Sequence, residues 1–334
     1  MMKKYVALVA SVLLMLALFA GCGTETPAAD EGDAYQSVDI NVTAIAGPTG
    51  VGLVNLMKKQ EDAAAANNYK FNVVSDPTQA VAAISNGSAD IAAVPTNLAS
   101  TLYKKTEGKV QVLALNTLGV LHMLSNGVEI NSVADLKGQT IYTQGQGANP
   151  EYILKYVLEK NGLDPEKDVK IEFVADNDAL AAVMINGTAK VAMVPEPKAS
   201  AILLQNAAIQ RVLNMTEEWG KVSEEGSRLV MGCVIARKEF VEQNPAAVAK
   251  FLEEYQASIE DIATDVEKCA AFCESYGIIP NAALAKKAIP NCGLTYLDGA
   301  ELKAHLSAYL NILFGYNPAA IGGQVPADDF YYAG

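Results

Sequence analysis

The sequence predicts an α/β protein built from two related lobes. Its clearest sign is a duplicated segment, in which Asn86 to Pro95 is repeated without a gap at Asn186 to Pro195. Patterns typical of strands and helices alternate around both copies, and the chain after about residue 238 is almost entirely helical in pattern. Two copies are too few for a solenoid, which needs three or more stacked units. They therefore indicate two lobes, and a cleft between lobes is a usual place for a ligand.

The first half begins with an alternating, β-branched run at 38–46 that is typical of a strand. A glycine loop, Gly47 to Gly50, leads from this run into a helix expected at about 51–66. The rest of this half is expected to contain a strand at 71–75, a helix at 78–86 that ends at Gly87, a strand at 90–94 that ends at Pro95, and a strand at 109–115.

The second half repeats this order. Its expected elements are a strand at 140–143, a glycine loop at 145–149, a helix at 150–161, a strand at 169–174, a helix at 178–186, and strands at 190–194 and 210–213. The alternation predicts parallel sheets with helices on both faces. A strand at 228–236 follows, and then helices at about 238–244, 245–265, 266–276, 281–288 and 298–314, with an irregular tail at 322–334.

The first residues predict where the protein is located. Lys3 and Lys4 precede an apolar run from Tyr5 to Ala20, which is typical of a secretory signal. The run ends in Leu-Phe-Ala-Gly-Cys at 18–22, which resembles a bacterial lipobox. We therefore expect residues 1–21 to be a signal peptide, and 22–37 to comprise a lipidated Cys22 and a flexible tether. An uncleaved anchor helix is the alternative, and either places the body outside the cytoplasm.

Charge and cysteine usage exclude some classes of function. The net charge of −13 argues against a nucleic-acid partner, because phosphates require basic patches. The cysteines after Cys22 are either buried apolar residues, a disulfide between Cys292 and one of the pair at 269 and 273, or a metal site; they are Cys233, Cys269, Cys273 and Cys292. The two histidines, His122 and His305, form no zinc-like spacing with them, so we expect no metal and no cofactor.

Several short segments together resemble a known family. They are Ala46–Gly50, Asn86–Gly87 with Asp90–Ala92, Val133–Gln139, and Asn186–Gly187 with Val191–Pro197. With the lipobox and tether, their order and spacing resemble the substrate-binding lipoproteins of bacterial ABC importers. More narrowly, the chain resembles the nitrate/sulfonate/taurine and thiamine-pyrimidine-like branch of the type II periplasmic-binding proteins. The resemblance covers nearly the whole mature chain.

This resemblance implies a fold of two doubly wound α/β lobes joined by a two-strand hinge, with C-terminal helices on lobe 1. Lobe 1 would comprise 38–117 and 229–334, lobe 2 would comprise 118–228, and the crossovers would lie near 118–122 and 227–233. The implied function is that of a monomeric, membrane-anchored receptor that passes a small molecule to an ABC permease. An enzyme or a sensor on the same fold is the alternative, but no catalytic constellation is recognisable from motifs.

The predicted ligand-binding residues follow from the fold class, because ligands in open α/β sheets bind beyond the carboxyl ends of the strands. They lie in four loops and at the two crossovers: Gly47, Pro48, Thr49, Gly50, Pro95, Thr96, Asn97, His122, Gly145, Gln146, Gly147, Ala148, Asn149, Pro195, Glu196 and Gly232. Alternatives remain open for some of them. The glycine loops can be plain turns, Glu196 a solvated charge and His122 a structural residue. Trp219 is either a stacking surface or core.

The loops also predict the class of ligand. None of them contains Arg or Lys, so a charged anion would depend on helix N-termini and hydroxyl groups alone. Glu196 favours an amine or an N–H-bearing heterocycle instead. We therefore expect a small organic molecule rather than a bare inorganic anion.

Overall fold

The computed structural model describes residues 35–223 and 227–334. The predicted signal peptide, Cys22 and most of the tether lie outside these residues. Residues Ser37–Gly334 form one compact unit. Within the described part of the chain, every helix is too short or too polar to cross a membrane.

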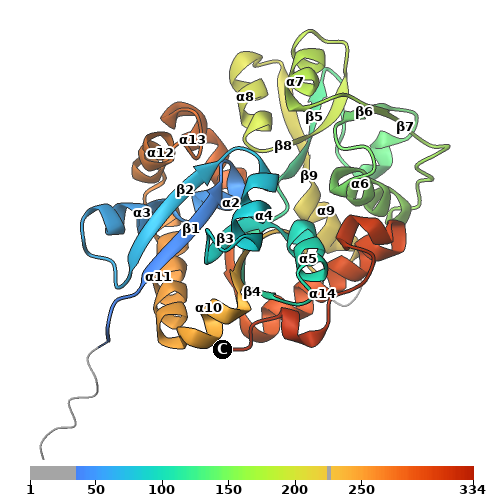
Figure 1. Ribbon diagram of the computed structural model, residues 1–334. Helices are drawn as coiled ribbons and strands as arrows, with labels where there is room; N and C mark the ends of the chain where they lie inside the picture. The colour runs from blue at the N-terminus through green and yellow to red at the C-terminus, as the bar shows by residue number, and fades with distance from the viewer. Residues whose placement is uncertain (1–34, 224–226) are drawn as a thin grey trace, which may run out of the picture. The chain divides into compact units, whose positions relative to one another are not determined.

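A six-stranded first sheet has the order β11-β4-β10-β3-β1-β2, and Figure 1 labels β1, β2, β3 and β4 of it. Its strands are β1 (Asp39–Ile45), β2 (Asn68–Val74), β3 (Ile91–Pro95), β4 (Val110–Leu118), β10 (Val230–Arg237) and β11 (Leu294–Leu297). The helices between β1 and β4 are α2 (Pro48–Val51), α3 (Val54–Glu61), α4 (Pro77–Ser85) and α5 (Thr96–Lys105). After β10 come α10 (Lys238–Gln243), α11 (Pro245–Thr264), α12 (Val266–Ser275), α13 (Ala282–Ala288), η3 (Ile289–Asn291), α14 (Gly299–Tyr316), η4 (Pro318–Ile321) and η5 (Asp328–Phe330).

A five-stranded second sheet has the order β7-β6-β8-β5-β9. Its strands are β5 (Leu121–Asn126), β6 (Thr140–Thr143), β7 (Lys170–Phe173), β8 (Val191–Pro195) and β9 (Ile209–Asn214). Its helices are η1 (Val133–Leu136), α6 (Asn149–Lys160), α7 (Asn177–Ile185), α8 (Lys198–Gln205) and α9 (Met215–Val222). Read as β9-β5-β8-β6-β7, this sheet has the same order as β4-β10-β3-β1-β2, so the duplication extends to the topology.

Both sheets are mixed, so the expectation of parallel sheets was wrong for β5 in the second sheet and for β10 and β11 in the first, where β11 runs antiparallel to β4. In the first sheet β10 runs antiparallel to β3 and β4, and in the second sheet β5 runs antiparallel to β8 and β9. Each of these strands enters after the chain has crossed from the other sheet. It starts beside the C-terminal ends of its neighbouring strands, so it runs in the opposite direction. The predicted class, two α/β lobes joined by two crossing strands, is confirmed.

The duplicated segments have the same local structure. Asp76 and Asp176 both cap the following helix, accepting hydrogen bonds from backbone N–H groups of its first turn. Gly87 and Gly187 both follow the helix end with φ of 79°, a left-handed conformation that glycine adopts without a steric penalty. The repeat in sequence is therefore a repeat of one helix–turn–strand unit.

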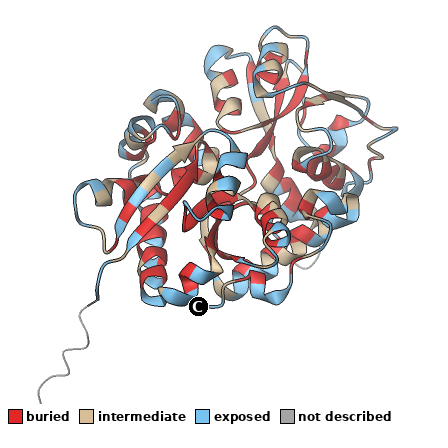
Figure 2. Ribbon diagram, in the orientation of Figure 1, coloured by how far each residue is buried: buried red, intermediate tan, exposed pale blue. Residues whose placement is uncertain are grey.

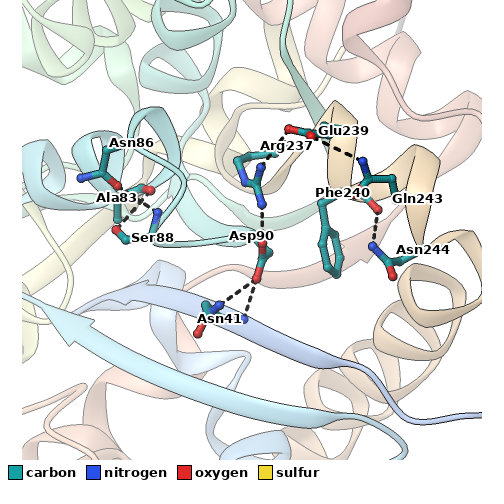
Figure 3. Close-up of polar contacts among 10 residues, drawn as sticks. All are labelled: Asn41, Ala83, Asn86, Ser88, Asp90, Arg237, Glu239, Phe240, Gln243 and Asn244. Carbon is teal, nitrogen blue, oxygen red and sulfur yellow. Dashed lines mark hydrogen bonds and ion pairs between the residues drawn. The ribbon is translucent and has the colours of Figure 1, made fainter.

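One position of the repeat differs in chemistry. Asp90 accepts hydrogen bonds from the backbone N of Asn41 at 2.9 Å and from its side chain at 3.0 Å. Arg237 donates to the other carboxylate oxygen at 2.6 Å, as Figure 3 shows. The equivalent Lys190 is exposed. Asp90 therefore joins β3 to β1 and β10 in the first sheet alone.

The core covers both faces of each sheet, and the strands are the most continuously buried part of the chain (Figure 2). Trp219 is fully buried, with its ring centroid 4.2 Å from that of Tyr156 and 5.7 Å from that of Tyr309. Because α9, α6 and α14 contribute these three rings, Trp219 is a core residue that joins helices of both sheets. Of the two alternatives for Trp219, packing in the core is the one observed.

The helix that follows the first glycine loop differs from the sequence-based expectation. The single helix expected at 51–66 is instead α2 followed by α3, and Gly52 is the C-cap of the short α2.

The cysteines at 233, 269, 273 and 292 are all buried and free. Burial raises the pKa of Cys273 to about 12. A disulfide among these four is therefore wrong, and they pack as apolar residues.

Candidate ligand-binding site

The strand ends of the first sheet bring several predicted residues together. Pro95 of β3 lies opposite Gly232 of β10, and Gly232 lies opposite Thr117 of β4. A Cβ atom on Gly232 would lie 2.6 Å from Asn116 Oδ1 and 2.7 Å from Thr49 Cγ2. Glycine is therefore required here because the first glycine loop and the end of β4 approach its backbone closely.

Asn116, which was not among the predicted site residues, supports this arrangement. Its side-chain amide donates to the carbonyl oxygen of Thr49 at 3.1 Å and to the hydroxyl of Tyr255 at 2.9 Å. Its own oxygen accepts a hydrogen bond from Thr117 Oγ1 at 2.9 Å. Asn116 is 1% exposed, so these hydrogen bonds lie inside the protein and hold the backbone at Thr49 in place.

The first glycine loop is held in place by backbone geometry. Gly47 has a φ of 116° and donates its N–H to the carbonyl of Ile278 at 2.8 Å. A Cβ atom on Gly50 would lie only 2.5 Å from the carbonyl oxygen of Ile45. The loop is therefore a tight turn with a fixed backbone, and its role in binding a ligand stays a prediction. The turn also leaves Pro48 and Thr49 half-buried, with Thr49 beside Gly232.

In the second loop of the first sheet, Pro95 to Asn97, one side chain is buried and hydrogen-bonded within the protein. Thr96 is fully buried, and its hydroxyl donates to the carbonyl of Val230 at 2.9 Å. Asn97 is half-buried. Helix α5 begins at Thr96 with no side-chain cap and no acidic residue in its first turn. Its first N–H groups and the positive end of its dipole are therefore not neutralised by the chain's own side chains.

The glycine loop of the second sheet has a different electrostatic character. Gly145 and Gly147 have φ of 83° and 71°. The N–H of Gly147 donates to Glu151 Oε2 at 2.7 Å, and Lys155 pairs with the same carboxylate at 2.9 Å. Asn149 is 7% exposed, and its side-chain oxygen has no partner among the described residues. The start of α6 therefore has the Glu151 carboxylate beside it, and the side-chain oxygen of Asn149 is an acceptor without a partner among the described residues.

Glu196 is not a solvated loop charge, so that alternative was wrong. Its side chain is fully buried and forms an ion pair with Arg211 of β9. It also accepts hydrogen bonds from the hydroxyl of Ser200 at 3.0 Å and from its backbone N–H at 3.2 Å. Burial raises the pKa of Glu196, and the nearby Arg211 only partly opposes this shift. The adjacent Pro195 lies opposite Leu121 at the end of β8.

His122 fits the structural alternative. It is 1% exposed, and its Nε2 lies 3.0 Å from the carbonyl oxygen of Asn291 in η3. A carbonyl only accepts, so Nε2 carries the hydrogen, and Nδ1 has no partner among the described residues. Burial lowers the pKa of His122 to about 4, so the ring is neutral at pH 7. His122 therefore ties the second sheet to the C-terminal segment.

The helix starts of the two sheets differ in their electrostatic character. On the second sheet, Glu151 and Glu196 accept hydrogen bonds from backbone N–H groups near the starts of α6 and α8. On the first sheet, the starts of α2 and α5 have neither a side-chain cap nor an acidic residue. The contacts of the described residues join Thr49, Pro95 and Gly232 into one group, but they do not join this group to the loop at 145–149.

Cavities elsewhere do not include this group. One of about 590 Å³ lies at the opposite edge of the first sheet, beside Asn86, Lys109 and the Arg237 shown in Figure 3. Gln146 lines another, of about 330 Å³, together with Glu151 and Lys155. Strand ends and crossovers remain the better candidate for a ligand in this fold class. The described part of the chain holds no cluster of three His, Cys, Asp or Glu residues suited to a metal ion.

Comparison with known proteins identifies the family. A family model described as NMT1/THI5 like matches residues 68–268, which is more than half of the 334 residues. The chain belongs to the NMT1/THI5-like family. The resemblance suggested by its sequence segments is therefore confirmed.

Relatives of this NMT1/THI5-like chain are distant. The putative binding protein YtlA of Bacillus subtilis is 27% identical over 173 residues, which are 50% of this chain and 48% of YtlA. The chain thus matches about half the length of this curated relative.

Solved structures confirm the fold of the NMT1/THI5-like chain. An ABC transporter structure from Parabacteroides distasonis has a TM-score of 0.74 at 20% identity and covers 89% of this chain and 99% of its own. The aliphatic sulphonate-binding protein SsuA of Escherichia coli has a TM-score of 0.67 at 17% identity, covering 86% and 92%. The nitrate-binding protein NrtA of Synechocystis has a TM-score of 0.60 at 17% identity, covering 86% and 84%.

Proposed function

We propose that this protein is an extracytoplasmic solute-binding protein that captures a small organic molecule between two lobes and delivers it to an ABC permease. The lobes would be 38–117 with 229–334, and 118–228. The observation that carries the proposal is the convergence of Thr49, Pro95 and Gly232 at the strand ends of the first sheet. The duplicated topology places the loop at 145–149 at the equivalent strand end of the second sheet.

The polar groups at these strand ends favour a ligand with both acceptors and donors. The uncapped start of α5 suits an oxygen or another acceptor group of the ligand. The unused side-chain oxygen of Asn149 suits an N–H donor. Arg211 contacts Glu196, a residue of the predicted loops, and Glu196 balances its charge. The relatives SsuA and NrtA bind a sulphonate and nitrate, whereas we propose an uncharged or N–H-bearing organic ligand here.

The anchor is proposed on the sequence alone. Residues 1–21 would be removed as a signal peptide, and Cys22 would carry the lipid that holds a monomeric receptor at the outer face of the cell membrane. A few acyl chains suffice for stable anchoring, since each buried CH₂ contributes about 0.8 kcal/mol.

Thermal-shift screening of the purified protein tests the function. The panel would contain sulfonates, nitrate, thiamine precursors, flavins and aromatic amines. We expect an organic compound to raise the melting temperature, because a ligand at one hundred times its dissociation constant stabilises the folded state by about 2.7 kcal/mol. Mass spectrometry should recover that compound unchanged. Conversion of a compound into product, or stabilisation by nitrate alone, would contradict the proposal.

A further inference from the structure

A separate cavity lies where helices of the two sheets meet. Its volume is about 300 Å³, and its walls are Ser200, Leu203, Leu204, Arg211, Lys287 and Asn291. Helix α8 and strand β9 contribute one wall, and α13 and η3 contribute the other. None of these six residues belongs to the predicted strand-end loops. The hydrogen bond from His122 to Asn291 anchors the second wall to the second sheet.

The cavity has a net positive charge. Lys287 is exposed and has no ion pair among the described residues, whereas the neighbouring Lys286 pairs with Glu267 at 2.9 Å. Arg211 forms an ion pair with Glu196, yet 21% of its side chain remains exposed. Because that pair is neutral as a whole, the charge of Lys287 is unbalanced in this cavity. An anionic group is the complement that the cavity lacks.

The cavity also has an apolar part, which α8 contributes. Leu203 is half-buried, and Leu204 is 52% exposed, although most large apolar side chains in the described part of the chain are covered. A single exposed leucine is ordinary, but this pair lines a cavity that also contains cationic groups. Small-molecule sites combine apolar walls with a few polar groups in this way, and about 300 Å³ is at the lower end of their range.

We propose that this cavity binds a short-chain organic carboxylate. The carboxylate would lie against Lys287 and the exposed part of Arg211, and the hydrocarbon tail would lie on Leu203 and Leu204. Since the two walls come from different sheets, the bound carboxylate would also hold α8 against α13. The inference does not depend on which ligand occupies the strand-end site, or on whether that site binds one.

A leucine-methyl NMR titration of the full chain tests this site directly. The probe is 3-methylbutanoate, and its neutral analogue 3-methylbutanamide has the same shape without the charge. We expect saturable shifts of the Leu203 and Leu204 methyl signals with the carboxylate, and much weaker binding of the amide. Lys287→Ala should weaken carboxylate binding by about threefold, as for a largely exposed ion pair. Lys286→Ala, one residue away, should not change it.

Two further results decide the inference. Leu204→Asp should abolish the saturable shift of the Leu203 methyl signals, because it places a negative charge against the bound anion. Leu204 is 52% exposed, so we expect its replacement to leave the fold intact. Equal affinities for the carboxylate and the amide would overturn the inference. So would an affinity unchanged by Lys287→Ala, or the absence of saturable shifts at either leucine.

Discussion

Replacing Arg211 by alanine is expected to lower the free energy of unfolding by about 3 kcal/mol. The substitution leaves the fully buried carboxylate of Glu196 with only Ser200 as a partner. Breaking one side of a buried ion pair typically costs about 3–5 kcal/mol. The lower end applies because 21% of the Arg211 side chain is exposed and water reaches it. Urea unfolding followed by circular dichroism measures the change.

The pH dependence separates this charge effect from a simple loss of packing. The folded protein raises the pKa of Glu196 above its unfolded value of about 4.3, so the folded state binds this proton more tightly. The unfavourable contribution of the charged carboxylate is therefore fully present above the raised pKa, and absent below the unfolded one. Without Arg211 the raised pKa rises further. The loss in Arg211→Ala should thus shrink as the pH falls.

A double variant is the matched control. Arg211→Met with Glu196→Gln removes both charges while keeping similar side-chain volumes, and replacing both members of a buried pair is often nearly neutral. We expect the double variant to be more stable than Arg211→Ala at pH 8. A loss that is the same at every pH, and that the double variant does not relieve, would show that Arg211 acts through packing alone.

Gly232→Ala is expected to have the second-largest effect, on stability and on ligand binding together. The added methyl group would lie 2.6 Å from Asn116 Oδ1, 2.7 Å from Thr49 Cγ2 and 2.8 Å from Thr117 Cβ. Inserting a methyl group into a space this tight costs about 1–3 kcal/mol. Relief requires Thr49 to move, which displaces a residue of the proposed site. We therefore expect at least about tenfold weaker ligand binding, equivalent to about 1.4 kcal/mol.

Gly220→Ala is its matched control. Gly220 lies in α9, and a Cβ atom there would have no neighbour within 4 Å. Alanine is favoured over glycine within a helix, so this variant should be at least as stable as the natural protein. Calorimetric titration of both variants with the compound found by screening compares their affinities. An unchanged ligand affinity in Gly232→Ala would show that the strand ends of the first sheet do not form part of the binding site.

The sequence predicted the repeated elements well because their signals are local. Asp76 and Asp176 cap helices, and glycines at 87 and 187 end them with a left-handed turn. Strand β5 was not recognised, because only two residues separate it from the end of β4. Its direction and partners depend on the chain entering a second sheet, which no local pattern encodes.

The candidate site was predicted in its backbone but not in its supporting side chains. Gly232 was predicted to let the backbone approach a ligand, and this role stays a prediction; the structure shows that side chains of Thr49 and Asn116 lie close to its backbone. Asn116 and Arg211 were missed because each acts on a residue far away in the chain, Thr49 and Glu196 respectively. For Asn116 the available signal was a polar residue inside the mostly apolar strand β4, whereas the strand of Arg211, β9, also contains Gln210 and Asn214 and gave no such signal. The partner of such a residue is fixed only by the packing of the strands.

Hydrogen exchange with and without the ligand tests the central claim most directly. The claim is that the strand-end loops of both sheets contact one molecule, and each loop contains backbone N–H groups that report on contact. The account predicts protection of 47–50, 96–98 and 145–149 by the same compound, and loss of that protection in Gly232→Ala. Protection confined to the loops of one sheet, or to the helices around Lys287, would contradict it.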